Sequence, residues 1–217
     1  MRHVKEVRRE LIESYLSAKE TVISCGYATE IDWQDSRSFS SLTESEFIKE
    51  AAWVVLSSGM RETVIQRVFM DISPIFQNWI SATAIAQNRD ICEPDALRIF
   101  NNPRKICAIY SICEKVARIG FERFKASVQV RGVDFLQELD FIGPITKFHL
   151  AKNIGLDVVK PDRHLVRLAK AANFDDPKDL CQTIANITGD KVSVIDIVLW
   201  RFATLNARYT TFFQQRD

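Results

Sequence analysis

The residues best suited to chemistry lie in the segment DRHLVR, which begins at Asp162 and includes His164 and Arg167. Leu165 and Leu168 recur at helical spacing, so we expect Asp162 to be the N-cap of a helix. A capping carboxylate is held in one orientation, and from there it can stabilise a developing positive charge or activate water. Asp is also a favoured N-cap for purely structural reasons, so catalysis and simple capping are both open for Asp162.

A pair of short helices is predicted immediately upstream, over residues 132–140 and 144–153. The turn that joins them contains Gly143, which we expect to adopt a backbone conformation closed to other residues. Pro144 suits the first position of the second helix, because its missing N–H would have no partner there. The pattern therefore predicts two helices joined by a tight turn.

The start of the second helix is a candidate phosphate-binding site. The N–H groups of Ile145 and Thr146 are expected to be free there, beside the positive end of the helix dipole. Such an end binds a phosphate without a special side chain, and Lys147 follows nearby. The backbone around Gly143, Ile145 and Thr146, together with Lys147, is thus the predicted anion-binding set.

This hairpin resembles the helix-hairpin-helix motif, whose usual form is roughly L-P-G-[VI]-G-x-x-T-A. Here it reads LDFIGPITK: Gly143, the β-branched residue before it and Thr146 match, whereas Phe141 and Lys147 replace a glycine and an alanine. Asp162 follows Gly143 by nineteen residues and opens D-x-H-x-x-R, which is close to the spacing in the DNA glycosylase superfamily named after this motif. A helix–glycine–helix turn also occurs in proteins that bind no DNA.

The likeness continues upstream of the hairpin. Residues 47–65 (FIKEAAWVVLSSGMRETVI) are similar to the L-E-x-x-Q-A-G-L-S-W-x-T-V stretch of the bacterial 3-methyladenine glycosylase I family. The segment NPRKI resembles that family's R-N-R-x-K-I, with Asn102 and Lys105 in register. The resemblance spans residues 47–171 and implies that Asn102 and Lys105 contact DNA.

The same resemblance implies residues that recognise the base. In that family a Glu-Trp pair precedes the first of these helices, and Asp32-Trp33 is a possible counterpart, with Glu30 as a rival for the acid. Trp33, Trp53 and Tyr110 are candidates for stacking on the base. Trp53 lies on an apolar helix face, where a tryptophan is more often part of the core.

The resemblance implies a monofunctional DNA glycosylase that flips out a damaged base, with alkylated purines as the first expected substrates. Asp162 would be its catalytic carboxylate, beside an oxocarbenium-like sugar. In endonuclease III-like relatives the hairpin carries a Schiff-base lysine, and that position here is Ile145, so no efficient lyase activity is implied. The zinc-binding and cysteine-cluster patterns of these branches are absent, so we expect no metal and no cofactor.

Two other classes stay open. One is a non-catalytic helix-hairpin-helix DNA-binding protein, in which Asp162 only caps its helix. The other is a helical interaction protein with no nucleic-acid role, which the near-neutral net charge of +1 favours. Salt-dependent DNA affinity separates these two, since only a DNA binder shows it.

The elements that must position these residues are predicted to be helices. The 217 residues include only seven Gly and six Pro, and apolar residues recur at helical spacing, which predicts an all-α fold. We expect a central lobe of residues 43–154, including the hairpin of residues 133–154, and a second lobe of residues 1–42 and 155–217. In the superfamily that the chain resembles, the pocket lies at the junction of two such lobes.

Local signals place several helix boundaries. Thr43 and Glu46 have the spacing of a capping box, and Asn102 followed by Pro103 marks another helix start. Residues 25–41 are polar and irregular, so we expect no helix there.

The charge distribution is uneven. Residues 101–132 carry seven Lys/Arg against two acids, residues 141–170 carry six against two, and residues 26–50 carry six acids against two bases. The two basic stretches could face phosphate or simply be solvated.

Composition also bears on location. Five widely spaced cysteines without a CxxC pair indicate free thiols in a reducing compartment. The absence of a signal peptide and of an apolar run of roughly 18 residues indicates an intracellular protein with no membrane partner. We expect a monomer, in the cytoplasm or nucleoid or in the nucleus, whose partner is double-stranded DNA with a damaged base.

Overall fold

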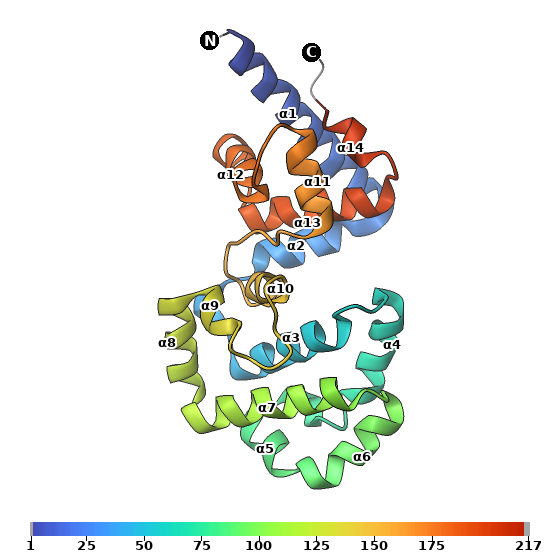
Figure 1. Cartoon of the computed structure of the whole chain (residues 1–217), viewed down its shortest axis with the longest axis vertical. Helices are drawn as coiled ribbons and strands as arrows, with labels where there is room; N and C mark the ends of the chain where they lie inside the picture. The colour runs from blue at the N-terminus through green and yellow to red at the C-terminus, as the bar shows by residue number, and fades with distance from the viewer. Residues whose placement is uncertain (1, 215–217) are drawn as a thin grey trace. The chain divides into compact units, whose positions relative to one another are not determined.

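The computed structural model describes residues 2–214, with side chains from residue 9 onward. Its elements are the helices α1–α14 and the short helices η1–η3, and the described residues contain no strand (Figure 1), which confirms the all-α prediction. The chain divides into a central unit, Ser38–Ile154, and a terminal unit made of the residues before and after it. Among the described residues there is no helix that is both long enough and apolar enough to cross a lipid bilayer.

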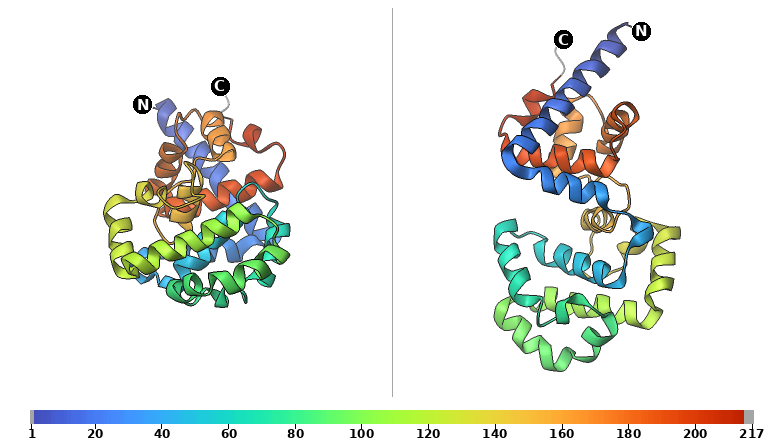
Figure 2. Two further views of the ribbon diagram at one scale, coloured as in Figure 1. Left: turned by 60° about the horizontal axis from the view of Figure 1, so that its bottom comes forward. Right: turned by 180° about the vertical axis from the view of Figure 1, so that it is seen from behind.

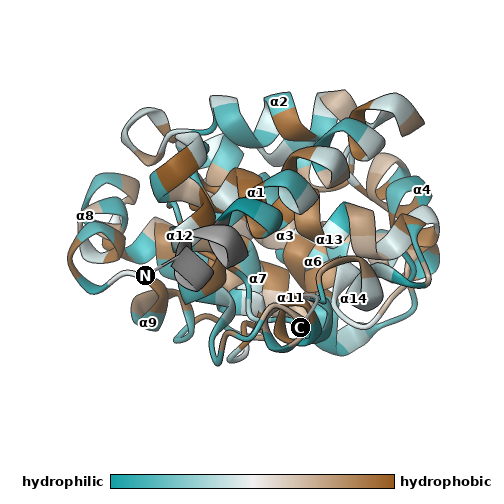
Figure 3. Cartoon of the chain, turned by 90° about the horizontal axis from the view of Figure 1, so that it is seen from above, coloured by the Kyte–Doolittle hydropathy of each residue, from teal (hydrophilic) through white to brown (hydrophobic). Residues whose placement is uncertain are grey.

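The terminal unit is built around one apolar helix, α13 (Val192–Leu205), which carries hydrophobic residues along most of its length (Figure 3). α13 packs against each of the long helices of the unit. The hydroxyl of Tyr15 and the ammonium of Lys19 both donate to Asp190, at 2.5 and 2.7 Å, and so fix the first helix to the start of α13. The other elements of this unit are α1 (Arg2–Val22), η1 (Ile23–Tyr27), α2 (Ala28–Ser36), α11 (Arg163–Ala171), α12 (Pro177–Thr188) and α14 (Tyr209–Phe212).

The segment predicted to be irregular is largely helical, so the expectation for residues 25–41 is wrong. A π-helical turn, η1, contains Gly26 with φ +90°, and α2 follows it directly. Arg201 of α13 donates two hydrogen bonds to Glu30 of α2, with Nε at 2.9 Å and Nη2 at 2.5 Å. Because this pairing joins residues far apart in the sequence, a local pattern does not reveal it.

The central unit has an aromatic core around α7 (Pro103–Ile119), which lies beside α3 and α5. The ring of Phe76 lies 4.9 Å from that of Trp79 and 5.0 Å from that of Tyr110, while the rings of Phe47 and Phe124 are 4.6 Å apart. The two views of Figure 2 show the helices of this unit from two further directions. Its other elements are η2 (Phe39–Ser41), α3 (Glu44–Ser57), α4 (Glu62–Ile72), η3 (Gln77–Trp79), α5 (Ala82–Gln87), α6 (Arg89–Ile99), α8 (Phe121–Arg131), α9 (Val133–Leu136) and α10 (Thr146–Asn153).

The helix starts predicted from local signals are confirmed. Thr43 and Glu46 form a reciprocal capping box at the start of α3. The side chain of Asn102 accepts a hydrogen bond from the N–H of Lys105, and Pro103 is the first residue of α7. These boundaries are set by side chains within three residues of the helix start, which is why the sequence alone predicts them.

Candidate active site

Asp162 is the N-cap of α11, as predicted. Its Oδ1 accepts hydrogen bonds from the N–H groups of His164 at 2.8 Å and Leu165 at 3.1 Å. Its Oδ2 has no hydrogen bond to any described residue, and the residue is partly exposed. One oxygen therefore orients the carboxylate, and the second oxygen is open to a ligand or to water.

The loop before Asp162 is fixed at two points to the start of α13. The carboxylate of Asp157 accepts the N–H of Ser193, near the start of α13, at 2.9 Å. The carboxylate of Asp196, which is only 1% exposed, accepts the N–H of Lys160 at 2.7 Å. Asp196 was not predicted as a functional residue, although an acid inside the apolar start of α13 was a signal for it.

The imidazole of His164 lies beside Asp162 and packs against Tyr209, with ring centroids 5.6 Å apart. Burial lowers the pKa of His164 below its ordinary value of 6.5, and only the charge of Asp162 opposes this shift. The ring is therefore neutral near pH 7. Its Nδ1 and the hydroxyl of Tyr209 are buried and have no hydrogen-bond partner among the described residues.

The hairpin takes its unusual backbone conformation at Phe141 and not at Gly143. Phe141 has φ +66°, whereas Gly143 is not among the residues with positive φ, so the expectation for Gly143 is wrong. Phe141 occupies the place of the first glycine in the usual motif, where a left-handed conformation favours glycine. The helix α10 begins at Thr146, two residues later than predicted.

Some backbone N–H groups of the hairpin donate hydrogen bonds within it, and others have no described acceptor. The N–H of Gly143 donates to the hydroxyl of Thr146 at 2.7 Å, and the N–H of Lys147 donates to the carbonyl of Gly143 at 3.0 Å. The N–H groups of Ile145 and Thr146 donate to no described residue, and Ile145 is 41% exposed. These two amides therefore lie unused at the start of α10, where the sequence predicted them.

The side chain of Lys147 is directed back to the first helix of the hairpin. Its ammonium lies 2.8 Å from the carboxylate of Asp134, and the side chain is only 13% exposed. The hydrogen bond from Lys147 holds the pKa of Asp134 below its usual range. An anion at the hairpin would therefore meet a lysine that already has a counter-ion.

Lys105 does not reach the surface, which corrects its predicted role as a DNA contact. It is 3% exposed, and its ammonium donates to the carbonyls of Leu56 at 2.6 Å and Ser58 at 2.7 Å, at the end of α3. The ammonium also lies 5.6 Å from the ring centre of Phe141 and 5.8 Å from that of Phe100. Burial lowers the pKa of Lys105. Lys105 of α7 instead links this helix to the end of α3 through two hydrogen bonds and to the hairpin turn through the ring of Phe141.

Tyr110 is also excluded from its predicted role, because it is wholly buried in the central unit and has no surface on which a base could stack. Trp53 is partly exposed, and its ring meets that of Phe69 edge-on at 5.3 Å. Both residues belong to the central unit, whereas the other proposed base contacts lie in α2.

Those three residues of α2 have different surroundings. Glu30 is paired with Arg201, whose guanidinium is stacked 4.3 Å from the ring centre of Tyr27, so this acid has a structural partner. Asp32 and Trp33 are exposed, and Trp33 is 40% exposed. Of the two acids weighed for base recognition, Asp32 is the accessible one.

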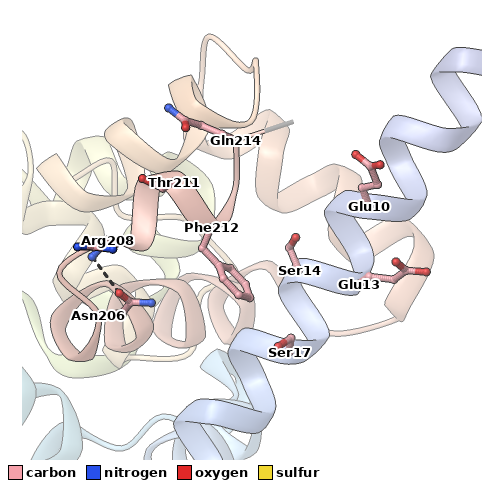
Figure 4. A pocket seen from close by; sticks show the side chains of 9 residues that line it. All are labelled: Glu10, Glu13, Ser14, Ser17, Asn206, Arg208, Thr211, Phe212 and Gln214. Atoms are coloured by element: carbon pink, nitrogen blue, oxygen red, sulfur yellow. Dashed lines mark hydrogen bonds between the residues drawn. The ribbon is translucent and has the colours of Figure 1, made fainter. Parts of the chain in front are cut away.

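A hollow of about 680 Å³ lies elsewhere in the terminal unit (Figure 4). It is open and mostly polar, and Phe212 extends toward the side chains of α1 that form one wall. None of the residues predicted from the sequence lines it. Its lining residues are Glu10, Glu13, Ser14, Ser17, Asn206, Arg208, Thr211, Phe212 and Gln214.

Comparison with known proteins gives no match. No family model, no curated protein and no solved structure matches the chain.

Proposed function

We propose that this chain is a monofunctional DNA glycosylase that removes a damaged base from double-stranded DNA. The observation that carries the proposal is the carboxylate of Asp162, which is oriented through Oδ1 and has Oδ2 free of described partners. Asp162 is the first residue of the D-x-H-x-x-R segment and lies downstream of the hairpin that resembles the helix-hairpin-helix motif. This position supports the same role.

The proposed reaction breaks the bond between the sugar C1′ and the base nitrogen. The damaged nucleotide first leaves the base stack, because the enzyme cannot reach this bond inside a duplex. The bonding electron pair departs with the base, and the sugar acquires oxocarbenium-like charge. The Oδ2 of Asp162 stabilises that charge or accepts a proton from the attacking water, whose oxygen then bonds to C1′. Alkylated purines are the substrate class that the resemblance favours.

The hairpin supports this proposal as a holder of the DNA backbone. The unused N–H groups of Ile145 and Thr146 suit a phosphate oxygen, because they lie at the positive end of α10. The Schiff-base position of lyase-active relatives is occupied by Ile145, and the nearby Lys147 is paired with Asp134. Both features favour hydrolysis alone over strand cleavage.

A second candidate is a DNA-binding protein without catalysis. It is favoured by the well-formed cap that Asp162 makes, since capping alone accounts for an aspartate at this position. Release of a base from a damaged duplex distinguishes the two candidates, because only the glycosylase produces it.

The test is a single-turnover assay on duplexes that each contain one 3-methyladenine, 7-methylguanine, hypoxanthine, uracil or 8-oxoguanine. The wild type is compared with Asp162→Asn, which retains an N-cap residue of equal quality. Asp176→Asn is the matched control, because Asp176 caps α12 in the same unit by accepting the N–H of Lys178 at 2.8 Å.

We expect abasic sites from the wild type and from Asp176→Asn on at least one duplex, and a loss of at least about a hundredfold in Asp162→Asn. Equal activity in Asp162→Asn and the wild type would refute the role of Asp162. No base release from any duplex, with salt-sensitive DNA binding, would favour the non-catalytic binder.

A further inference from the structure

The helix that begins after Asp162 carries an unusual exposed face. Arg163, Arg167 and Lys170 of α11 are all exposed. At 100° per residue, these three positions fall within about 60° of the helix circumference. They therefore form a single basic stripe, here called the α11 basic face.

The opposite side of the helix packs in the core of the terminal unit. Leu165, Leu168 and Ala169 are wholly buried, so rotation of α11 about its axis is prevented. The helix contains no acidic residue, and none of the three cations of the α11 basic face forms an ion pair with a described residue. The Nε of Arg163 donates to the Nε2 of His164 at 3.4 Å, which adds no negative charge. The stripe is thus held toward solvent without counter-ions from the described chain.

Several cations of the central unit bind other residues of the chain. Lys115 and Arg131 share Glu138, and Lys125 donates to the carbonyls of Ser40 and Leu42. Most of the cations in residues 101–132 therefore already bind acids or carbonyls of the central unit.

The exceptions in that stretch do not form a comparable stripe. Arg104, Arg118 and Arg123 are exposed, and no described residue is their ion-pair partner. Arg104 and Arg118 lie fourteen positions apart on α7, about 21 Å along its axis, and Arg123 belongs to the next helix, α8. The α11 basic face instead places three cations within seven positions.

The surroundings of His164 give a second observation. The charges that act on its imidazole come from Lys160, Arg163 and Arg167, against Asp162 as the opposing anion. Three cations and one carboxylate therefore lie around this end of α11. A polyanion is attracted to such a surface.

We infer that the α11 basic face binds the phosphate backbone of DNA, in the strand whose sugar meets Asp162. This inference rests on the proposed function. Arg163 and Lys170 are separated by about 10 Å along the helix axis, at 1.5 Å per residue, and Arg167 lies between them, so the three cations can contact consecutive phosphates of one strand. Guanidinium groups also suit the planar, two-point contact that phosphate oxygens accept.

The test measures the salt dependence of binding to an undamaged DNA duplex by fluorescence anisotropy. Arg167→Gln is compared with Lys178→Gln, because Lys178 is an exposed cation of α12 in the same unit and both changes remove one charge. We expect Arg167→Gln to reduce the slope of log K against log salt by about 0.9, and the triple change of Arg163, Arg167 and Lys170 to Gln by about 2.7. Lys178→Gln should leave the slope unchanged, and Arg167→Lys should restore it.

Equal slope changes in Arg167→Gln and Lys178→Gln would overturn the inference, because charge at any site would then have the same effect. Tighter binding to single-stranded RNA, or to vesicles with anionic lipids, through the same three residues would overturn the assignment to DNA. Far-UV circular dichroism verifies that each variant is folded.

If base release depends on Asp162 while the slope does not depend on the α11 basic face, the inference alone fails. If no duplex releases a base while the slope still depends on the α11 basic face, the proposed function alone fails.

Discussion

At the scale of single residues, Asp162 separates two tasks between its two oxygen atoms. Oδ1 satisfies two N–H groups of α11, and Oδ2 is open. The buried carboxylate of Asp196 then holds the loop that delivers Asp162, through the N–H of Lys160. Orientation thus comes from the backbone N–H groups, so the open oxygen needs no further side chain to hold it.

This division predicts different effects for two substitutions of Asp162. Asp162→Asn keeps a side-chain oxygen for the cap, so we expect its free energy of unfolding to stay near that of the wild type. Asp162→Ala leaves two N–H groups without the cap and should lower the free energy of unfolding by about 1 kcal/mol. Urea denaturation measures both values. Equal losses in the two variants would show that the charge, rather than the cap, stabilises α11.

Burial also decides what a residue contributes, as two lysines with the same chemistry illustrate. Lys105 and Lys125 each donate to two backbone carbonyls, but Lys105 is buried and Lys125 is partly exposed. We expect Lys105→Met to lower the free energy of unfolding by about 1–3 kcal/mol, because its carbonyls lose their partner without access to water. Lys125→Met should cost less, because water replaces the ammonium there. Chemical denaturation of both variants tests this, and equal costs would contradict it.

At the scale of elements, the hairpin keeps a tight turn although its sequence departs from the usual motif. Phe141 adopts the left-handed conformation, and Gly143 has an ordinary one with room for a Cβ, whose nearest neighbour would be the Thr146 hydroxyl at 3.8 Å. The turn is therefore strained at a phenylalanine and relaxed at a glycine.

Opposite responses are expected at these two positions. Phe141→Gly should be more stable than Phe141→Ala by about 1 kcal/mol, since only glycine adopts a positive φ without cost. Gly143→Ala should instead be neutral or stabilising by about 0.4–1 kcal/mol, because the unfolded chain loses freedom. Thermal and urea unfolding give both comparisons. A Phe141→Ala variant as stable as Phe141→Gly would exclude strain in the turn.

Elements fixed by local chemistry were predictable from the sequence, whereas those fixed by distant partners were not. The caps at Thr43, Asn102 and Asp162 depend on side chains within three residues, and all three are confirmed. The helix α2 was missed because it lacks an apolar periodicity of its own and is paired with α13. The burial of Lys105 was missed for the same reason, since its carbonyl partners lie more than forty residues away.

At the scale of the whole molecule, the chain folds into two units, and the central unit interrupts the terminal one. Each has its own buried apolar cluster: the terminal unit packs around α13, and the central unit packs around α7. The central unit is continuous in sequence, whereas the terminal unit requires residues from both ends of the chain.

This organisation predicts that the central unit is stable alone. A fragment of Ser38–Ile154 should show a helical far-UV circular dichroism spectrum and a cooperative thermal transition, because its core needs no residue from outside the unit. A fragment of residues 155–217 lacks α1 and α2, against which α13 packs, and serves as the control that should not unfold cooperatively. A gradual, non-cooperative loss of helicity in the Ser38–Ile154 fragment would contradict this view of the fold.

The interruption of the terminal unit also has a consequence in time. Leu11, Tyr15, Ala18 and Val22 of α1 belong to a core whose other half follows the central unit. At about 5–20 residues per second of synthesis, the ribosome needs roughly 6–25 s to make the central unit between the two halves. During that interval the apolar face of α1 has no partner helices from the second half of the core. We therefore expect the nascent chain to bind a chaperone that shields exposed apolar helices.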